Sequence, residues 1–419
     1  MSPLQPVRGT TDHLPELKAA HHHVTDTALA VSQLYGYAEM ATPIFEFTEV
    51  FSRPLGASSD VVTKETYSFE DRGGSSLTLR PEGTAAAMRA VISNGLTQTL
   101  PHRWFYQGPM FRYERPQKGR MRQFHQIGAE YIGVASAQAD AEIIALGAHI
   151  LSALGVLDKT VLHLNTLGDT QSRLAYRDAL TAYLEPFKAE LSEDSQRRLS
   201  TNPLRILDSK NETDRRLIAD APHLSDYLND TSKAHFDQLT SLLTKANIAF
   251  EHDELLVRGL DYYAHSAFEF ITSALGAQGT VLGGGRYDGL SEMLGGPALP
   301  AVGFAAGVER LALLAAPPAA TGCDIAICAA DKAAEAEAFG IAQQLRGAGC
   351  QTVMLSKNNL GKNLKAADRL GALYCVIIGS DELTSHQVML RQMRDGHQEL
   401  VAIDGLASHL SHHIALTKR

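Results

Sequence analysis

Two strand-like stretches joined by an arginine-rich turn constrain the fold of this chain more than any other feature. Aromatic and apolar residues dominate RWFYQGPMFRY (103–113) and QFHQIGAEYIGV (123–134), and the polar segment ERPQKGRMR connects them. Two such runs close together in the sequence predict an antiparallel hairpin with a long charged loop. Helical patterns at 83–93 and 137–154 flank the hairpin without strict alternation of strands and helices, so the sequence predicts an α+β fold.

The residues before the hairpin predict one helix and two further strands. Apolar residues recur with helical spacing from Leu14 to Leu34, and Gly36 ends the pattern. YAEMATPIFEF is typical of a strand that Pro43 interrupts, and SLTLR (76–80) is typical of a short strand. The chain therefore opens with helix and sheet together.

The middle of the chain changes character twice. From about 170 to 250 the sequence is helical and rich in charge, which indicates an inserted helical module. Strand-like sequence resumes at 255–271 and 279–284, and a helix of small residues is predicted at 305–315.

An Ala/Pro stretch at 315–322 has the composition of a linker. The residues beyond it alternate strand and helix patterns, which predicts a compact α/β domain. We therefore expect a first domain at 1–320, which contains the helical insertion, and a second at 324–419.

Charge and hydropathy exclude several classes of protein. Lys plus Arg total 38 against 47 Asp plus Glu, a net charge of −9, so any nucleic acid must be bound by local basic patches. We recognise no signal peptide and no stretch apolar enough to span a bilayer, and we expect a cytoplasmic protein with no membrane contact.

The cysteines and histidines show no metal-binding spacing. The four cysteines form no CxxC pair, which suits free thiols in a reducing compartment. No spaced carboxylate or thiol accompanies the histidine run at 21–23 or the pair at 412–413. We expect these imidazoles to be solvated or stacked, and we predict no protein-bound metal.

The charged hairpin is the first candidate for chemistry. Arg112 alternates with Phe111 and Tyr113 on a predicted strand, so its planar guanidinium can project from a rigid strand and bind a phosphate. The alternative is a solvated charged hairpin, which composition alone leaves equally open. The other basic residues of this region, opposed only by Glu114, are Arg103, Arg115, Lys118, Arg120 and Arg122.

The segment LLVRGLDYY (255–263) is the second candidate. Arg258 lies among apolar residues, where a guanidinium is costly unless it is paired or faces a ligand. Asp261 is a possible structural partner, so a purely structural role is equally open. Tyr262 and Tyr263 point to opposite faces if the segment is a strand.

Two further segments carry polar groups with less specific patterns. Glu82 either complements the dipole of the helix that follows it or receives the ammonium group of a ligand. Gln126 and Glu130, four residues apart, share one face of a strand. The glycines at 283–285 allow close approach of a ligand or form only a turn, and Arg310 beside Glu309 has the pattern of a surface ion pair.

Taken in order, these segments resemble the histidyl-tRNA synthetases, a family of class II aminoacyl-tRNA synthetases, over essentially the whole chain. RGTTDHLP, GYAEMATPIFE, FRYERPQKGRMRQFHQ and GVERL resemble the N-terminal signature and class II motifs 1, 2 and 3. LVRGLDYY resembles the histidine-site signature of the family. No departure from the family pattern is found at the residues that carry these matches.

The resemblance implies a class II antiparallel sheet with flanking helices, a helical insertion and a C-terminal anticodon-binding α/β domain, working as a homodimer. It implies that Arg112 and Arg258 act on the α-phosphate of ATP and that Arg310 binds the outer phosphates. The residues that it assigns to the histidine pocket are Glu82, Gly83, Thr84, Gln126, Glu130, Tyr262, Tyr263 and Tyr287.

The implied reaction has two steps. The carboxylate of L-histidine attacks the α-phosphorus of ATP, which is expected with Mg²⁺ as its counter-ion, and arginines stabilise the charge that accumulates on the phosphoryl oxygens. The histidyl-adenylate is then transferred to the 3′-terminal ribose of tRNA(His), and AMP is released. No general base is required in the first step, because the attacking carboxylate is already ionised.

Two alternatives share parts of this pattern. One is the regulatory paralogue of the family that serves as a non-catalytic subunit of ATP phosphoribosyltransferase; the added C-terminal domain and the complete arginine set argue against it. The other is an RNA-binding or signalling module with an inactive site, against which the same arginines argue. Histidine-dependent exchange of pyrophosphate into ATP separates both from a synthetase.

Overall fold

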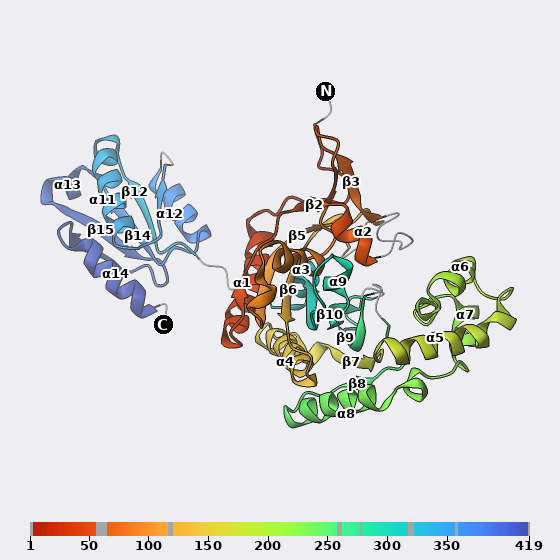
Figure 1. Cartoon of the computed structure of the whole chain (residues 1–419). Coiled ribbons are helices and arrows are strands. Elements are labelled where there is room, and N and C mark those ends of the chain that lie inside the picture. The colour runs from red at the N-terminus through yellow and green to blue at the C-terminus, as the bar shows by residue number, and fades with distance from the viewer. Residues whose placement is uncertain are drawn as a thin grey trace. The chain divides into compact units, whose positions relative to one another are not determined.

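The computed structural model describes residues 3–55, 65–115, 120–257, 262–276, 279–316, 322–356 and 359–417. The chain divides into two compact units, Met1–Pro318 and Ala319–Arg419. Figure 1 shows the elements of each unit along the chain.

A large, mostly antiparallel sheet forms the centre of the first unit (Figure 1). Its strands, in their order across the sheet, are β1 (Ala38–Glu39), β5 (His102–Phe111), β6 (Gln123–Ile132), β11 (Ala301–Gly307), β10 (Thr280–Arg286), β9 (Ala264–Ile271), β7 (Val161–Thr166) and β8 (Glu251–His252). Strands β5 and β6 pair antiparallel over their whole length, from His102 opposite Ile132 to Phe111 opposite Gln123. The predicted hairpin is therefore confirmed.

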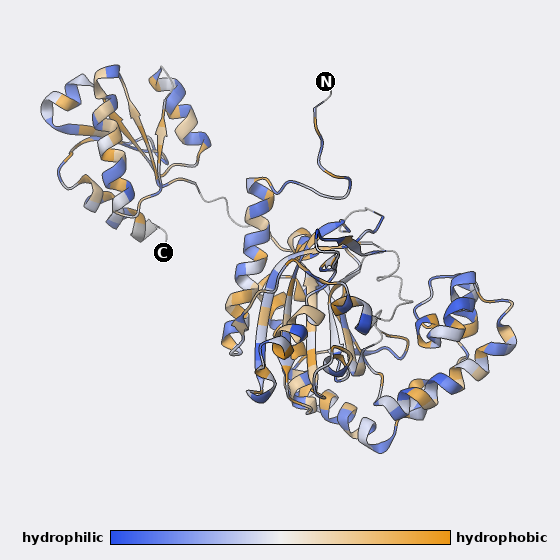
Figure 2. Ribbon diagram, turned by 45° about the horizontal axis from the view of Figure 1, so that its top comes forward, coloured by the Kyte–Doolittle hydropathy of each residue, from blue (hydrophilic) through white to orange (hydrophobic). Residues whose placement is uncertain are grey.

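Helices cover both faces of this sheet. Helices α1 (Pro15–Leu34), α4 (Ala137–Ala153), α8 (Asp230–Lys245) and α10 (Val308–Leu314) pack on one face and form the main core with side chains such as Ile127 and Ala129 of β6. Figure 2 shows the apolar character of these central strands. Because alternate strand residues point to opposite faces, Gln126 and Glu130 lie on the other face, beside α3 (Thr84–Ser93) and α9 (Leu290–Met293).

A small antiparallel sheet follows the break at Pro43. It contains β2 (Phe45–Phe47), β4 (Ser76–Leu79) and β3 (Tyr67–Glu70), in that order, and helix α2 (Glu49–Leu55) follows β2. Strands β1 and β2 belong to different sheets, as the interruption by proline predicts.

The region predicted as a helical insertion contains α5 (Thr170–Leu184), α6 (Glu193–Thr201) and α7 (Glu212–Ile218) before α8 returns to the sheet. These helices share a separate small core that includes Tyr176, Leu180 and Leu199. Asp169, Ser192 and Asn211 cap their N-termini by accepting hydrogen bonds from backbone N–H groups.

The second unit is an α/β domain. Its sheet contains β13 (Thr352–Leu355), β12 (Ile325–Ala329), β14 (Tyr374–Ile378), β15 (Gln387–Gln392) and β16 (Gln398–Ala402), in that order. Its helices are α11 (Glu335–Gly347), α12 (Leu360–Arg369), α13 (Ser380–Ser385) and α14 (Leu406–Thr417). The α+β fold with an α/β C-terminal domain is therefore confirmed.

Two local predictions require correction. Residues Ala305 to Gly307 were predicted as helix but end strand β11, and α10 begins only at Val308. Small residues suit that strand because a Cβ atom at Gly303 would lie 1.7 Å from Glu130 Oε2. Strand β9 begins at Ala264, later than the predicted 255–271; residues 258–261 lie outside the described part of the chain.

Within the described residues, we find no helix with the length and apolar character needed to cross a bilayer.

Candidate functional site

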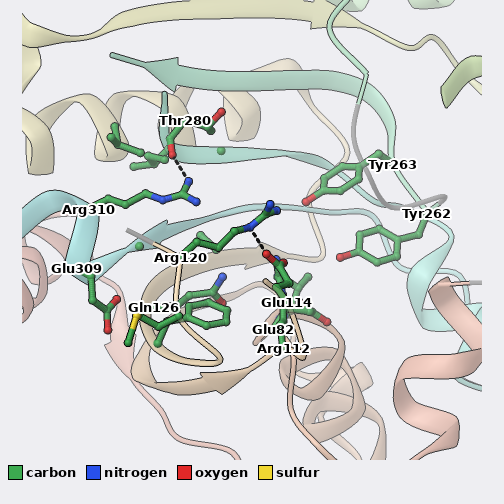
Figure 3. A pocket seen from close by; sticks show the side chains of 18 residues that line it. Glu82, Arg112, Glu114, Arg120, Gln126, Tyr262, Tyr263, Thr280, Glu309 and Arg310 are labelled. Atoms are coloured by element: carbon green, nitrogen blue, oxygen red, sulfur yellow. Dashed lines mark hydrogen bonds and ion pairs between the residues drawn. The ribbon is translucent and has the colours of Figure 1, made fainter. Parts of the chain in front are cut away.

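A cleft opens on the face of the large sheet that carries α3. Residues of β6, β10, β11, the β5–β6 hairpin and the first turns of α3 and α10 line it (Figure 3). The predicted site residues among them are Glu82, Thr84, Arg112, Gln126, Tyr262, Tyr263 and Arg310. The fold therefore brings together residues from four distant parts of the sequence.

Glu82 combines the two roles that the sequence left open. Its carboxylate accepts hydrogen bonds from the backbone N–H groups of Thr84 (2.6 Å) and Ala85 (2.9 Å), so it caps helix α3. Burial raises the pKa of Glu82, while these backbone hydrogen bonds act to lower it. The helix cap is thus real, and the same carboxylate borders the cleft.

Glu130 lies fully buried behind the cleft wall. Thr84 Oγ1 and the Tyr106 hydroxyl donate to Oε1 at 2.7 and 3.2 Å, and the Tyr287 hydroxyl hydrogen-bonds to Oε2. Burial raises the pKa of Glu130 to about 8, although these hydrogen bonds oppose the rise. A ligand therefore reaches Glu130 only if one of these hydroxyl groups gives way.

Tyr106 explains why Gly83 is a glycine. A Cβ atom at Gly83 would lie 2.2 Å from the Tyr106 ring, and one at Gly128 would lie equally close to it. Gly83 also precedes α3 as its N-cap residue. Because Gly83 has no side chain, the Tyr106 ring fits beside Glu130.

Three polar side chains on the cleft wall are oriented for a ligand. The rings of Tyr262 and Tyr263 lie in a tilted arrangement with centroids 4.9 Å apart, and both hydroxyl groups point into the cleft (Figure 3). They precede strand β9, so they do not point to opposite faces as a strand would require. The Tyr262 hydroxyl and Gln126 Oε1 are buried without a hydrogen-bond partner among the described residues, a costly state that a polar ligand would relieve.

Three arginines concentrate positive charge in the same cleft. Arg112 donates from Nε to Pro81 O (2.9 Å), Arg310 donates to Thr280 O (2.6 Å), and Arg120 pairs with Glu114 (Figure 3). Burial and then the like charges of Arg120 and Arg112 lower the pKa of Arg310. Such mutual repulsion of buried cations favours the binding of a polyanion.

Arg258, the remaining predicted phosphate ligand, lies outside the described residues, as does its possible partner Asp261.

The family model described as histidyl-tRNA synthetase matches residues 9–311, which include every described residue of the cleft. The chain belongs to the histidyl-tRNA synthetase family. The model described as anticodon binding domain matches residues 324–413, in the second unit. The regulatory paralogue was expected to have the catalytic region without such a domain.

Relatives of this family match over nearly the full chain. Histidine–tRNA ligase of Gluconacetobacter diazotrophicus is 52% identical over 98% of this chain and 99% of the relative, and that of Rhodospirillum rubrum is 52% identical over the same shares. The crystal structure of apo S. aureus histidyl-tRNA synthetase superimposes with a TM-score of 0.83 at 34% identity, covering 98% of this chain and 100% of that one.

Some cleft residues of this histidyl-tRNA synthetase family member escaped the sequence analysis. Tyr106 and Glu309 carry no ligand pattern of their own, although the strand alternation around Phe105 would have placed Tyr106 on the same face as Gln126. Glu309 was predicted to pair with Arg310, but it accepts hydrogen bonds from the backbone N–H and the ring of His125. Arg310 instead reaches into the cleft.

Proposed function

We propose that this chain activates L-histidine with ATP to histidyl-adenylate and pyrophosphate, and then transfers histidine to the 3′-terminal ribose of tRNA(His) with release of AMP. The observation that carries the proposal is the cleft itself. It combines buried polar groups that have no hydrogen-bond partner among the described residues with a cluster of guanidinium groups, inside a sequence of this family.

The cluster of guanidinium groups suits the triphosphate. Arg112 would stabilise charge on the α-phosphoryl group during attack by the histidine carboxylate, together with Arg258 as the sequence resemblance implies, and Arg310 would hold the outer phosphates. Mg²⁺ would enter as the counter-ion of ATP, and Glu114 offers a carboxylate of the kind that this ion binds.

The buried polar groups suit histidine. Glu82, at the start of α3, and Gln126 would bind the amino group together with Thr84, while Tyr262 and Tyr263 would contact the imidazole. Its N–H group would replace one hydroxyl donor at Glu130, because a neutral imidazole offers one donor and one acceptor. Tyr287 supports this pocket by holding the second oxygen of Glu130.

The test is exchange of labelled pyrophosphate into ATP by the full-length protein without tRNA. We expect exchange with L-histidine and none with other amino acids, because the groups around Glu130 require a donor and an acceptor on the ligand ring. Absence of exchange by folded protein would refute the proposal and favour one of the two non-catalytic alternatives.

The second unit would bind tRNA as the anticodon domain of 324–419, and residues 1–320 would form the catalytic domain. Lys362, Lys365 and Arg369 lie exposed on α12, where they can contact phosphates; Lys357, a further basic residue of this cluster, lies outside the described residues. Replacing the three by alanine should lower tRNA charging and leave pyrophosphate exchange unchanged. Unchanged tRNA charging by this variant would refute a role of this surface in tRNA binding.

We also propose a homodimer that uses the small sheet. Phe45 and Phe47 of β2 and Phe69 of β3 are 50%, 63% and 47% exposed on a sheet face whose centre is Leu77 and Leu79 of β4. Such an apolar face indicates a protein partner. Phe47→Glu should halve the mass measured by sedimentation, and an unchanged mass would exclude this interface.

The cytoplasmic location is also a proposal. The four cysteines are free and buried, which suits a reducing compartment. Fractionation of cells that produce the protein, followed by immunoblotting, would test it.

A further inference from the structure

Three imidazoles and a carboxylate meet at the edge of the cleft, which Glu309 also lines. They belong to His13 before α1, His21 on α1, His125 on β6 and Glu309 in the first turn of α10. One potential ligand atom from each residue lies within 4.8 Å of the others. The ring centroids of His13 and His21 are 4.2 Å apart, and those of His13 and His125 are 4.9 Å apart.

Half of this cluster is held rigidly. Glu309 accepts hydrogen bonds from the backbone N–H of His125 (2.9 and 3.0 Å) and lies 3.0 Å from its Nδ1. Figure 3 shows the Glu309 carboxylate turned away from the Arg310 guanidinium. Strand β6 and helix α10 therefore fix an imidazole and a carboxylate in one place.

The other half contains an unsatisfied group. His21 is only 2% exposed, and its Nε2 atom has no hydrogen-bond partner within the described ranges. A buried ring nitrogen without a partner is costly, and packing of aromatic rings alone does not satisfy it. His13 and His125 are half-buried, so an ion can reach the cluster from solvent.

We propose that His13, His21, His125 and Glu309 form a zinc(II) site that fastens the N-terminal segment to strand β6 and helix α10. Three nitrogens and one oxygen form a tetrahedral set typical of zinc, whereas calcium and magnesium require mainly oxygen ligands. Bonds of about 2.0 to 2.2 Å place tetrahedral ligands roughly 3.4 Å apart, so side-chain rotations suffice to close the cluster. The site departs from the absence of metal that the sequence predicts.

The position of the segment gives the site a structural role. Arg122 and Gln123, at the end of the charged hairpin, donate backbone hydrogen bonds to Gly9 O (2.8 and 3.4 Å). Gly9 has a φ of +88°, and a Cβ atom there would lie 2.8 Å from the Arg122 side chain. Zinc would add a cross-link four residues further along, at His13, and hold the segment against the base of the hairpin.

The test uses the full-length protein without an affinity tag, stripped with a chelator and titrated with zinc chloride in the absence of free histidine. We expect one zinc ion per chain by calorimetry, and intense visible d–d absorption of tetrahedral geometry with cobalt(II). His13→Gln and His21→Gln should each weaken zinc binding by more than the roughly 100-fold that loss of an outer-shell contact can reach. Zinc should raise the melting temperature of the wild type and not of these variants.

His22→Gln is the matched control, because His22 lies next to His21 on the same helix and is exposed. It should bind zinc as the wild type does. If the His13 variant bound zinc as tightly as the wild type, or if the wild type gave no tetrahedral cobalt spectrum, the site would be overturned. Neither measurement needs the His21 variant, so the test stands even if that variant does not fold. An equal loss in the His22 variant would instead assign the ion to surface histidines.

Discussion

Arg286 and the arginines of the cleft, all in the first unit, have opposite surroundings. Arg286 on β10 is fully buried and pairs with Asp140 of α4, with Asp288, and with the backbone oxygen of Val134 (3.0 Å). Burial acts to lower its pKa, but these carboxylates raise it overall. Arg310 in the cleft has a lowered pKa, because burial and two other arginines act in the same direction.

The difference separates a structural cation from a ligand-binding one. Arg286 has carboxylates and carbonyl oxygens around its guanidinium, so the protein satisfies this charge by itself. The cleft instead places Arg112, Arg120 and Arg310 near one another, and Arg120 pairs there with Glu114. Arg286 should therefore control stability, and the cleft arginines should control catalysis.

The largest expected effect is on stability, in Asp140→Asn. This change leaves the Arg286 charge buried without its main partner, and breaking a buried pair costs about 3 to 5 kcal/mol. Urea unfolding should measure the loss, while adenylate formation by the remaining folded protein stays near the wild-type rate. In the exposed pair Arg177–Asp178, Asp178→Asn should change the unfolding free energy by less than about 0.5 kcal/mol. Equal losses in the two variants would contradict the distinction.

The next effect is on catalysis, in Arg112→Ala. Loss of a preorganised cation at a phosphoryl group should slow single-turnover adenylation by about 10²- to 10³-fold. Arg112→Lys should recover little, because an ammonium group lacks the planar pair of donors. The melting temperature should not fall, since removal of one charge relieves repulsion at Arg310. A large drop in melting temperature at an unchanged rate would assign Arg112 to the structural class.

Sequence patterns predicted the secondary structure around the hairpin because two runs rich in aromatic and apolar residues, close together in the sequence, leave few alternatives. They failed at the end of β11, where Ala305 to Gly307 were predicted as the start of a helix and instead continue the strand that passes Glu130 at Gly303. The cluster of His13, His21, His125 and Glu309 could not be predicted either. Its members lie on α1, on the segment before it, on β6 and on α10, and only the fold brings these parts together.

The pH dependence of stability extends the comparison to carboxylates. Burial raises the pKa of Glu130 to about 8, so the folded state holds a proton that the unfolded chain loses above its ordinary pKa near 4.5. Stability should therefore fall as pH rises towards 8, by at most about 1.4 kcal/mol per pH unit from this group. Unfolding measured between pH 6 and 8.5 should show a shallower dependence in Glu130→Gln. An identical slope would mean that Glu130 is ionised in the empty cleft.

The smallest effect distinguishes two neighbouring tyrosines. The hydroxyl of Tyr262 has no hydrogen-bond partner in the described structure, whereas that of Tyr287 binds Glu130. Tyr262→Phe should therefore leave the melting temperature unchanged or slightly higher, and should raise the KM for histidine roughly 2- to 10-fold, the value of one ordinary hydrogen bond. Tyr287→Phe should lower the melting temperature, because it removes a donor from a buried carboxyl group. If Tyr262→Phe lost stability and kept its KM, the hydroxyl would belong to the core rather than to the histidine pocket, and the cleft would be polar for structural reasons at that position.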